Sequence, residues 1–222
     1  MTLSHPSFNS LTRRSKPYVH PSWLAKSVSG DRQCLLASYI QANYKVPAKP
    51  NNDFDLEKYK LKHQQTLVSY VGALHSIGYE VYAEAANSFS YKTKTGATIS
   101  AQPDIVAMRD DVPVIVDIKT GKPKATDIAQ VKLYMAMSPS INLHGINTIP
   151  NGRLVYGMDE LDIDASEVTT EFKQQVAQVM SALTISDIPD PTPSLCECRW
   201  CPVNHVCSYK TEKVTEGSDD WL

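Results

Sequence analysis

The stretch QPDIVAMRDDVPVIVDIKTGKPKATDIAQVKLY, residues 102–134, holds two strand-like runs followed by a helix-like run. Asp104 stands at the start of the first run, and Asp117-Ile118-Lys119 lies thirteen residues later on the second. Because side chains alternate along a strand, Asp117 and Lys119 share one face. The opposite face is apolar and carries Val114, Val116 and Ile118. The pattern therefore predicts a sheet with an apolar face for the core and a charged face for chemistry.

Two carboxylates on adjacent strands have the chemistry of a divalent metal site. Hard oxygen ligands suit Mg²⁺ or Mn²⁺, and Asp104 and Asp117 can converge on one ion. Lys119 beside them can assist an attacking water or stabilise charge on a phosphoryl group. An Asp–Lys pair is also common on plain strand surfaces, so the upstream Pro-Asp at hairpin distance is what favours the site.

Other side chains are candidates for the same site. Gln130 and Tyr134 are four residues apart, hence on one face of the predicted helix, where together they can hydrogen-bond a phosphate or a base. His63, in the helical run before the strands, can offer an imidazole to a metal, although His75 competes for that role. Glu84 is a further candidate carboxylate.

The rest of the chain predicts mixed α/β structure. Periodicity predicts helices over 22–44, interrupted at Gly30, and over 54–77, about 126–137, and 166–184. Strands are predicted over 79–91, 97–108, 112–120 and 154–158. Three prolines between 189 and 193 lead into a cysteine-rich segment.

Composition excludes several classes of protein. The length of 222 residues suits a single domain. The net charge of −2 excludes a basic nucleic-acid-coating protein and an acidic disordered chain. The charge is uneven, because residues 157–222 hold thirteen acidic and four basic side chains. No Gly-x-Gly pair or phosphate loop occurs, so no dinucleotide or ATP site is indicated. Without a signal peptide or an apolar span of about twenty residues, we expect a cytoplasmic protein that contacts no membrane.

Four of the five cysteines lie within residues 196–207, as thiols clustered for a metal do. Cys198, Cys201 and Cys207 need a fourth ligand. Cys196 would complete a zinc knuckle, and distant Cys34 would complete an iron–sulfur cluster; His205 is a third candidate. The spacing leaves these alternatives open.

Taken in order, His63, Asp104, Asp117-x-Lys119 and Gln130-x-x-x-Tyr134 resemble the PD-(D/E)xK nucleases of the RecB-like branch. The resemblance implies a restriction-endonuclease-like α/β fold, a mixed central sheet flanked by helices. It implies a metal held by His63, Asp104, Asp117 and the carbonyl of Ile118, with Asp104, Asp117 and Lys119 catalytic. It also implies that Gln130 and Tyr134 bind DNA. Lys122 and Lys124 are candidate contacts to the DNA backbone, because their charge can neutralise phosphates.

Among these nucleases, the CRISPR-associated RecB-like exonucleases and the nuclease subunit of AddAB helicases are similar in their cysteines. They have one cysteine before the core and Cys-x-x-Cys-x5-Cys after it. The resemblance implies a 4Fe–4S cluster on Cys34, Cys198, Cys201 and Cys207, leaving Cys196 without a role. It implies a helical N-terminal segment (1–53), a nuclease core (54–188) and a C-terminal iron–sulfur segment with an acidic tail (189–222), packed as one unit.

The expected function is therefore a Mg²⁺- or Mn²⁺-dependent DNA exonuclease that prefers single-stranded DNA. By resemblance it acts in CRISPR spacer acquisition beside integrase proteins, or in phages or mobile elements. The alternative is a non-catalytic, zinc-binding DNA-binding or assembly module whose acidic tail docks a partner.

Overall fold

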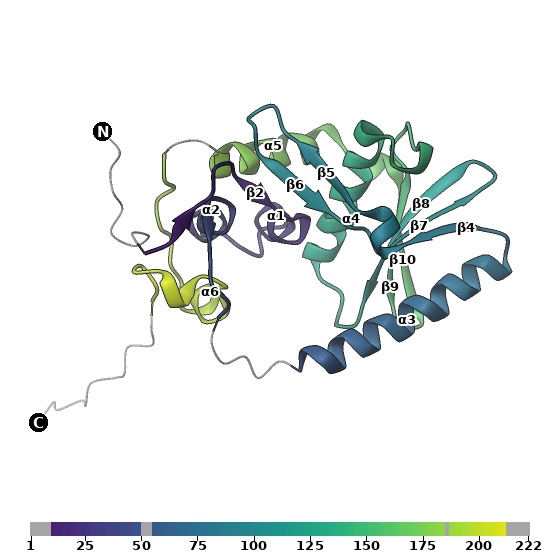
Figure 1. Ribbon diagram of the computed structural model, residues 1–222, viewed down its shortest axis with the longest axis horizontal. Helices are drawn as coiled ribbons and strands as arrows, with labels where there is room; N and C mark the ends of the chain where they lie inside the picture. Colours follow the sequence, from purple (N-terminus) through teal and green to yellow (C-terminus); the bar gives the residue numbers. More distant parts are fainter. Residues whose placement is uncertain (1–9, 50–54, 185–186, 212–222) are drawn as a thin grey trace, which may run out of the picture.

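The computed structural model describes residues 10–49, 55–184 and 187–211. Its centre is a five-stranded mixed sheet with the order β10-β9-β8-β7-β4. The strands span Glu80–Ala83 (β4), Ile105–Arg109 (β7), Val112–Lys119 (β8), Asn151–Tyr156 (β9) and Asp159–Ile163 (β10). Within this sheet, as far as the described residues form it, β8 and β9 are the only parallel neighbours, and helix α4 (Ala125–Met137) joins them. This is the predicted mixed sheet flanked by helices, and Figure 1 shows it at the right of the molecule.

Helix α3 (Leu56–Ser76) covers one face of this sheet (Figure 1). Its N-terminus is capped by Asp55, whose carboxylate accepts a hydrogen bond from the backbone N–H of Lys58 at 2.9 Å. Leu67 and Leu74 pack against Val116 and Ile118 on β8, as the alternation along that strand predicts. The core of this layer therefore uses the apolar face of the strand that carries Asp117.

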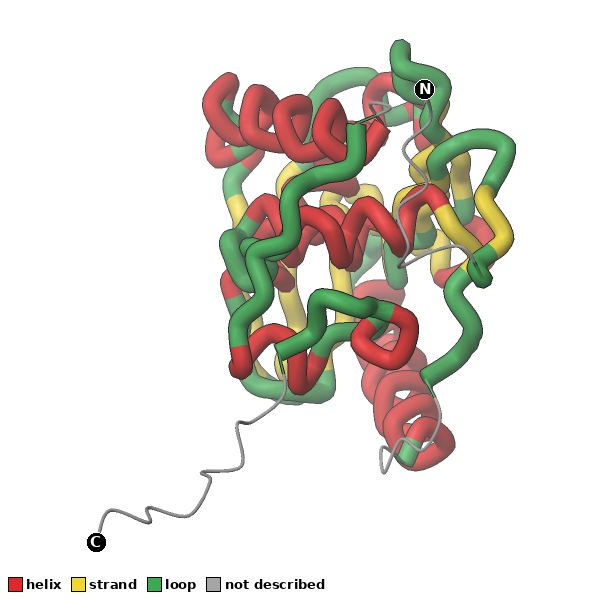
Figure 2. Tube along the Cα trace, turned by 90° about the vertical axis from the view of Figure 1, so that its left-hand side faces the viewer, coloured by secondary structure: helices red, strands yellow, loops and turns green. Residues whose placement is uncertain are grey.

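Helix α4 covers the opposite face and is itself enclosed. Val131 and Met135 are fully buried against the sheet. Behind α4 lie α1 (Pro21–Val28) and α5 (Thr170–Thr184), and α2 (Leu35–Asn43) packs on α5. Figure 2, seen from the side of α2, shows these helices in front of the strands. The predicted break between the first two helices is confirmed, with Gly30 at φ 81°.

Two of the predicted strands are each divided in the structure. Residues 79–91 form β4, a 3₁₀ turn (η2, Glu84–Asn87) and β5 (Phe89–Lys92). Residues 97–108 form β6 (Thr98–Ala101) and β7, separated by residues 102–104. In both cases the chain passes from one sheet to another, because β5 and β6 join β2 (Tyr18–Val19) in a separate three-stranded sheet. A single long strand over either range was therefore a wrong prediction.

Other boundaries also differ. Helix α5 begins at Thr170, after the 3₁₀ turn η5 (Ala165–Glu167), and β9 begins before the predicted 154. The sequence did not predict β10, nor the short strands β1 (Thr12–Arg13) and β3 (Tyr44–Lys45) and the 3₁₀ turns η3 (Ser138–Ile141) and η4 (Leu143–Gly145). By contrast, Asp110 and Asp111 form the tight β7–β8 turn as predicted, with φ of 52° and 60°.

The cysteine-rich segment forms α6 (Leu195–Trp200) and the 3₁₀ turn η6 (Asn204–Val206). It packs on the N-terminal helices, where Val203 is buried against Leu36 and Ile40 of α2. The predicted boundary at 53–54 and residues 212–222 of the acidic tail lie outside the described residues. The proposed division into segments stays a prediction. Within the described ranges, no helix is both long and apolar enough to cross a membrane.

Candidate active site

Asp104 lies immediately before β7 and contacts helix α3 through His63. The β7–β8 register, continued by one residue, sets Asp104 opposite Asp117. Its Oδ2 accepts a hydrogen bond from the backbone N–H of Ile118 at 2.7 Å and lies 3.2 Å from Nε2 of His63 on α3. The hydrogen bond between His63 and Asp104 raises the pKa of His63, and burial opposes that rise. The negative charges of Asp104, Asp117 and Glu84 raise the same pKa further. The structure thus brings His63, and not His75, to the predicted carboxylates.

Asp117 and Lys119 form a buried ion pair. Lys119 Nζ lies 2.6 Å from Asp117 Oδ2, and Asp117 is only 3% exposed. Burial raises the pKa of Asp117 to about 6, and the positive charge of Lys119 opposes that rise. Burial would lower the pKa of Lys119, but the charge and hydrogen bond of Asp117 outweigh it and raise that pKa. Lys119 is therefore held as an ammonium ion.

Gln130 and Tyr134 meet this pair from α4. The Gln130 side chain accepts a hydrogen bond from Lys119 Nζ at 3.2 Å and donates one to the Tyr134 hydroxyl at 2.8 Å. Its amide nitrogen also lies 3.5 Å from Asp117 Oδ1. Tyr134 is 1% exposed and Gln130 is 9% exposed. The contacts in the structure are thus with Asp117 and Lys119, and the predicted DNA contacts of this pair stay a prediction.

Three further residues support the site and were not identified from the sequence. Asp127 lies 3.9 Å from Lys119 Nζ, and it accepts a hydrogen bond from the Tyr156 hydroxyl at 2.8 Å. Its spacing was a usable signal, because residues 127, 130 and 134 follow one stripe of a helix. Fully buried Asn87 donates to the carbonyls of Pro103 and Asp104 at 3.2 and 3.4 Å, which fixes the loop that carries the carboxylate.

Glu84 begins the 3₁₀ turn η2, where the chain passes from β4 in the five-stranded sheet to β5 in the three-stranded sheet. Its backbone N–H donates to the carbonyl of Asp104 at 2.8 Å, and its φ of 49° is left-handed. Its charge raises the pKa of His63, behind the effects of Asp104 and Asp117. The candidate carboxylate is therefore near the predicted metal ligands, at the periphery of the site.

The donor chemistry of the site fits a hard divalent cation. Asp117 Oδ2 is buried and accepts no well-formed hydrogen bond from the described residues, although the Lys119 ammonium is close. Carboxylates of Asp104 and Asp117, the His63 imidazole and the carbonyl of Ile118 are ligands that Mg²⁺ or Mn²⁺ accepts. In the described part of the chain, no three His, Cys, Asp or Glu side chains are already arranged around one metal position.

Lys122 and Lys124 follow β8 and are exposed. Both line a surface cavity of about 580 Å³ that also contains Lys119. Further basic side chains from α3, Lys58 and Lys62, line the same cavity. The predicted phosphate-contacting lysines are therefore next to the Asp117–Lys119 pair, on an open and basic surface.

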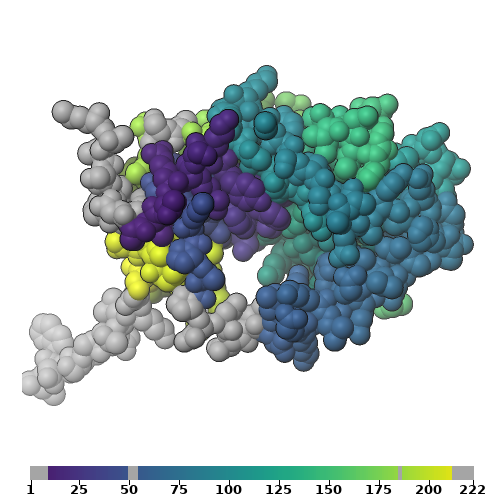
Figure 3. Space-filling view, in the orientation of Figure 1, coloured from purple at the N-terminus to yellow at the C-terminus, as the bar shows by residue number. Residues whose placement is uncertain are grey.

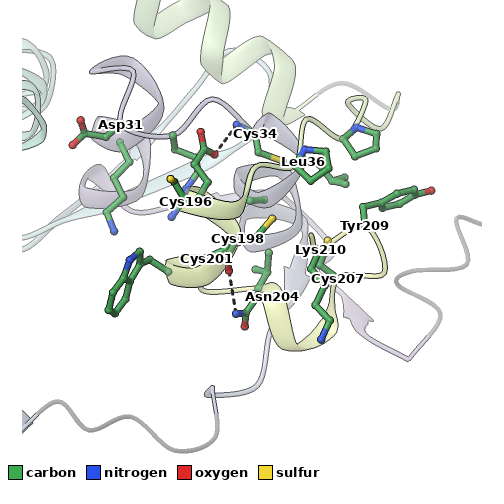
Figure 4. A pocket seen from close by; sticks show the side chains of 18 of the residues that line it. Asp31, Cys34, Leu36, Cys196, Cys198, Cys201, Asn204, Cys207, Tyr209 and Lys210 are labelled. Carbon is green, nitrogen blue, oxygen red and sulfur yellow. Dashed lines mark hydrogen bonds between the residues drawn. The ribbon is translucent and has the colours of Figure 1, made fainter. Parts of the chain in front are cut away.

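All five cysteines line one cavity of about 550 Å³ between α2 and α6, shown in Figure 4. Burial, and then the nearby charges of Cys207 and Cys34, raise the pKa of Cys201. Burial, and then the charges of Cys34 and Cys198, raise the pKa of Cys207. Cys196 is exposed and is absent from these interactions. Residues two apart on a helix point to nearly opposite sides, which separates Cys196 from Cys198.

Glu197 fixes Cys34 in this arrangement. Its two carboxylate oxygens accept hydrogen bonds from the backbone N–H groups of Gln33 and Cys34, at 3.0 and 3.2 Å. The thiols of Cys34, Cys198, Cys201 and Cys207 thus line a common cavity, although in the described residues no three of them are arranged around one metal position. Whether they bind iron–sulfur or zinc stays a prediction.

Comparison with known proteins identifies the fold and the family. No curated protein matches the chain. The solved structure titled "Crystal structure of SSO0001" is 13% identical, with a TM-score of 0.50, over 90% of this chain and 89% of that one. At this identity the likeness concerns the fold alone. Residues 53–208 match the family model of the PD-(D/E)XK nuclease superfamily. Such nucleases are hydrolytic DNA-cleaving enzymes that typically use divalent metals. With the match spanning both carboxylates, Lys119 and the C-terminal cysteines, the chain belongs to the PD-(D/E)XK nuclease superfamily.

Proposed function

We propose that the protein is a Mg²⁺- or Mn²⁺-dependent exonuclease that hydrolyses single-stranded DNA. The observation that carries this proposal is the buried Asp117–Lys119 pair beside Asp104 and His63. Lys119 Nζ lies 2.6 Å from Asp117 Oδ2, and His63 Nε2 lies 3.2 Å from Asp104 Oδ2. In this proposal His63, Asp104, Asp117 and the Ile118 carbonyl hold the ion. When bound, the ion supplies Lewis acidity at the scissile phosphate.

Lys119 acts as a fixed cation in this proposal. Asp117, Gln130 and Asp127 contact its ammonium group, at 2.6, 3.2 and 3.9 Å. A protonated, preorganised amine can orient the attacking water and stabilise the negative charge that develops on the phosphoryl oxygens. Gln130 connects this cation to Tyr134, so α4 keeps the lysine in position during the reaction.

The preference for single strands and the role in CRISPR spacer acquisition beside integrase proteins are finer proposals. They rest on the resemblance of Cys34 and Cys-x-x-Cys-x5-Cys to iron–sulfur exonucleases, together with the common cavity of these thiols. A nuclease of a phage or mobile element would have the same chemistry. A non-catalytic zinc module is the competing function, because the same thiols suit zinc.

The test is degradation of single-stranded DNA by the purified protein with Mg²⁺ or Mn²⁺. Asp117→Asn and Asp104→Asn should abolish degradation, whereas Asp111→Asn, at an exposed carboxylate in the β7–β8 turn, should leave it unchanged. A circular single strand should resist an exonuclease, and separate 5′ and 3′ labels give the polarity. Equal cleavage by the wild type and Asp117→Asn, or no cleavage by either, would refute the nuclease proposal.

The metal on the cysteines is tested independently of activity. A brown protein with broad absorbance near 400 nm and bound iron supports the 4Fe–4S cluster. A colourless protein with stoichiometric zinc contradicts it.

A further inference from the structure

Helix α6 has a second face that the cysteine cluster does not use. Cys196 and Trp200 are four residues apart, so they lie on the side of the helix away from Cys198. Trp200 is 78% exposed, and the guanidinium carbon of Arg199 lies 5.3 Å from its ring centroid. A large, exposed aromatic ring beside a cation offers a stacking surface.

Two lysines from distant parts of the chain line the same cavity as Trp200. Lys26 lies in α1 and Lys124 directly precedes α4, and both side chains are exposed. Neither forms an ion pair with a carboxylate within the described residues. Burial, then the positive charges of Arg32 and Lys124, lower the pKa of Lys26 despite the opposing charge of Asp31. The two ammonium groups thus repel each other, and an anion between them would relieve that repulsion.

The neighbouring charged groups do not neutralise this pair. Asp31 accepts a hydrogen bond from the Thr126 hydroxyl, and the Glu197 carboxylate is engaged by two backbone N–H groups. Arg32 is buried and donates to Gln41 Oε1 at 2.7 Å. The lining of the cavity carries four basic side chains (Lys26, Lys124, Arg32 and Lys210) against the two carboxylates of Asp31 and Glu197, so its net charge is positive.

Lys124 connects this surface to the candidate active site. It lines both the cysteine cavity and the cavity that contains Lys119, Lys122 and α3 residues Lys58 and Lys62. In Figure 3 the molecule is hollowed between the N-terminal end of α3, in blue, and the purple and yellow atoms of the N-terminal helices and cysteine segment. A basic surface thus runs from Lys119 past Lys124 to Trp200.

We propose that Trp200 is a base-stacking platform for the single strand outside the catalytic centre, with Lys26 and Lys124 binding a phosphate of the same strand. The inference rests on the proposed nuclease function and adds to it a second DNA contact. Single-stranded DNA fits because it offers unpaired base faces for the indole and phosphates for the lysines. A duplex hides its base faces within the stack, so it would use the lysines without the ring.

The test is equilibrium binding of a fluorescently labelled oligo-dT of about 20 nucleotides, measured by anisotropy in EDTA to prevent hydrolysis. Trp200→Ala should weaken binding about tenfold, and Trp200→Phe should retain most of the affinity, because stacking contributes about 1–3 kcal/mol per base. Binding of a blunt duplex should change little. Lys26→Ala should weaken binding and reduce the salt dependence by about 0.7 in the log–log slope.

Lys173→Ala, at an exposed lysine on α5, is the matched control and should bind like the wild type. Unchanged oligo-dT affinity in Trp200→Ala, or an equal loss for the duplex, would overturn the inference. Wild-type cleavage of DNA is scored separately. Cleavage with unchanged Trp200→Ala binding refutes only the platform, whereas an inactive wild type refutes the proposed nuclease.

Discussion

Gly152 on β9 lies against α4, and Gly152→Ala tests that packing. A Cβ atom at residue 152 would lie 2.5 Å from Val131 Cγ1 and 2.6 Å from Met135 Sδ. Both side chains are fully buried, and the β-branched valine has one strongly preferred rotamer in a helix. The added methyl group therefore cannot be accommodated by rotating Val131, and α4 has to move away from β9.

The expected cost is that of overpacking a dense core, about 1–3 kcal/mol in the free energy of unfolding. For a chain of this size, each kcal/mol lowers the melting temperature by about 2–4 °C, which gives a total of about 2–12 °C. Differential scanning fluorimetry and urea denaturation measure both quantities. DNA degradation should also fall, because α4 carries Gln130, which holds Lys119.

Gly72→Ala is the matched control. Gly72 lies within α3, and nothing is within 4 Å of its added Cβ. This substitution should stabilise the protein by about 0.5–1 kcal/mol, because alanine loses less backbone entropy in a helix. The two substitutions are expected to change the free energy of unfolding in opposite directions, because only the Cβ at residue 152 meets other atoms. A Gly152→Ala protein as stable as the wild type would refute the described contact between β9 and α4.

Three other substitutions test the supports of the two sites. Glu197→Gln should lower stability by about 1 kcal/mol in urea denaturation, since an amide has one acceptor oxygen for two backbone N–H groups. Asn87→Ala should cost about 1–3 kcal/mol and slow DNA degradation, because it frees the loop before Asp104; full activity would contradict this role. Cys201→Ala should reduce solubility, melting temperature and absorbance near 400 nm, whereas Cys196→Ser should not; equal losses would argue against the proposed ligand set.

The elements that the sequence predicted well are those in which one period extends over the whole element. Helix α3 and strand β8 are bounded by turn residues, because Gly78 follows the end of α3 and Asp110 and Asp111 precede the start of β8. The long strands failed because the chain changes sheets within them. The sequence Pro103-Asp104 carries a signal for such a break, since proline restricts the backbone and cannot donate to a ladder.

Strand β10 was missed for a different reason. Its sequence Asp-Glu-Leu-Asp-Ile is mostly exposed and acidic, and its apolar face is limited to Leu161 and Ile163, which is too short an alternation to detect. Cross-strand charge pairs hold this edge strand instead, with Arg153 on β9 lying 2.9 Å from Glu160 and 2.5 Å from Asp162. These acids account for part of the negative charge of the C-terminal third, and they lie on the far edge of the sheet from β4.

The candidate site combines residues from both faces of the sheet, which single-sequence reasoning could not establish. His63 comes from α3 on one face, and Gln130 and Asp127 come from α4 on the other. The C-terminal end of β8, Asp117-Ile118-Lys119, lies between the two helices. Its backbone N–H at Ile118 donates to Asp104, and its Lys119 side chain donates to Gln130 on α4. Displacing α4 therefore disturbs the lysine and its partners, while the His63–Asp104 contact at 3.2 Å depends on α3. The two helices therefore support different parts of the candidate site: α3 provides His63 beside Asp104, and α4 provides Gln130 beside Lys119 and Asp117.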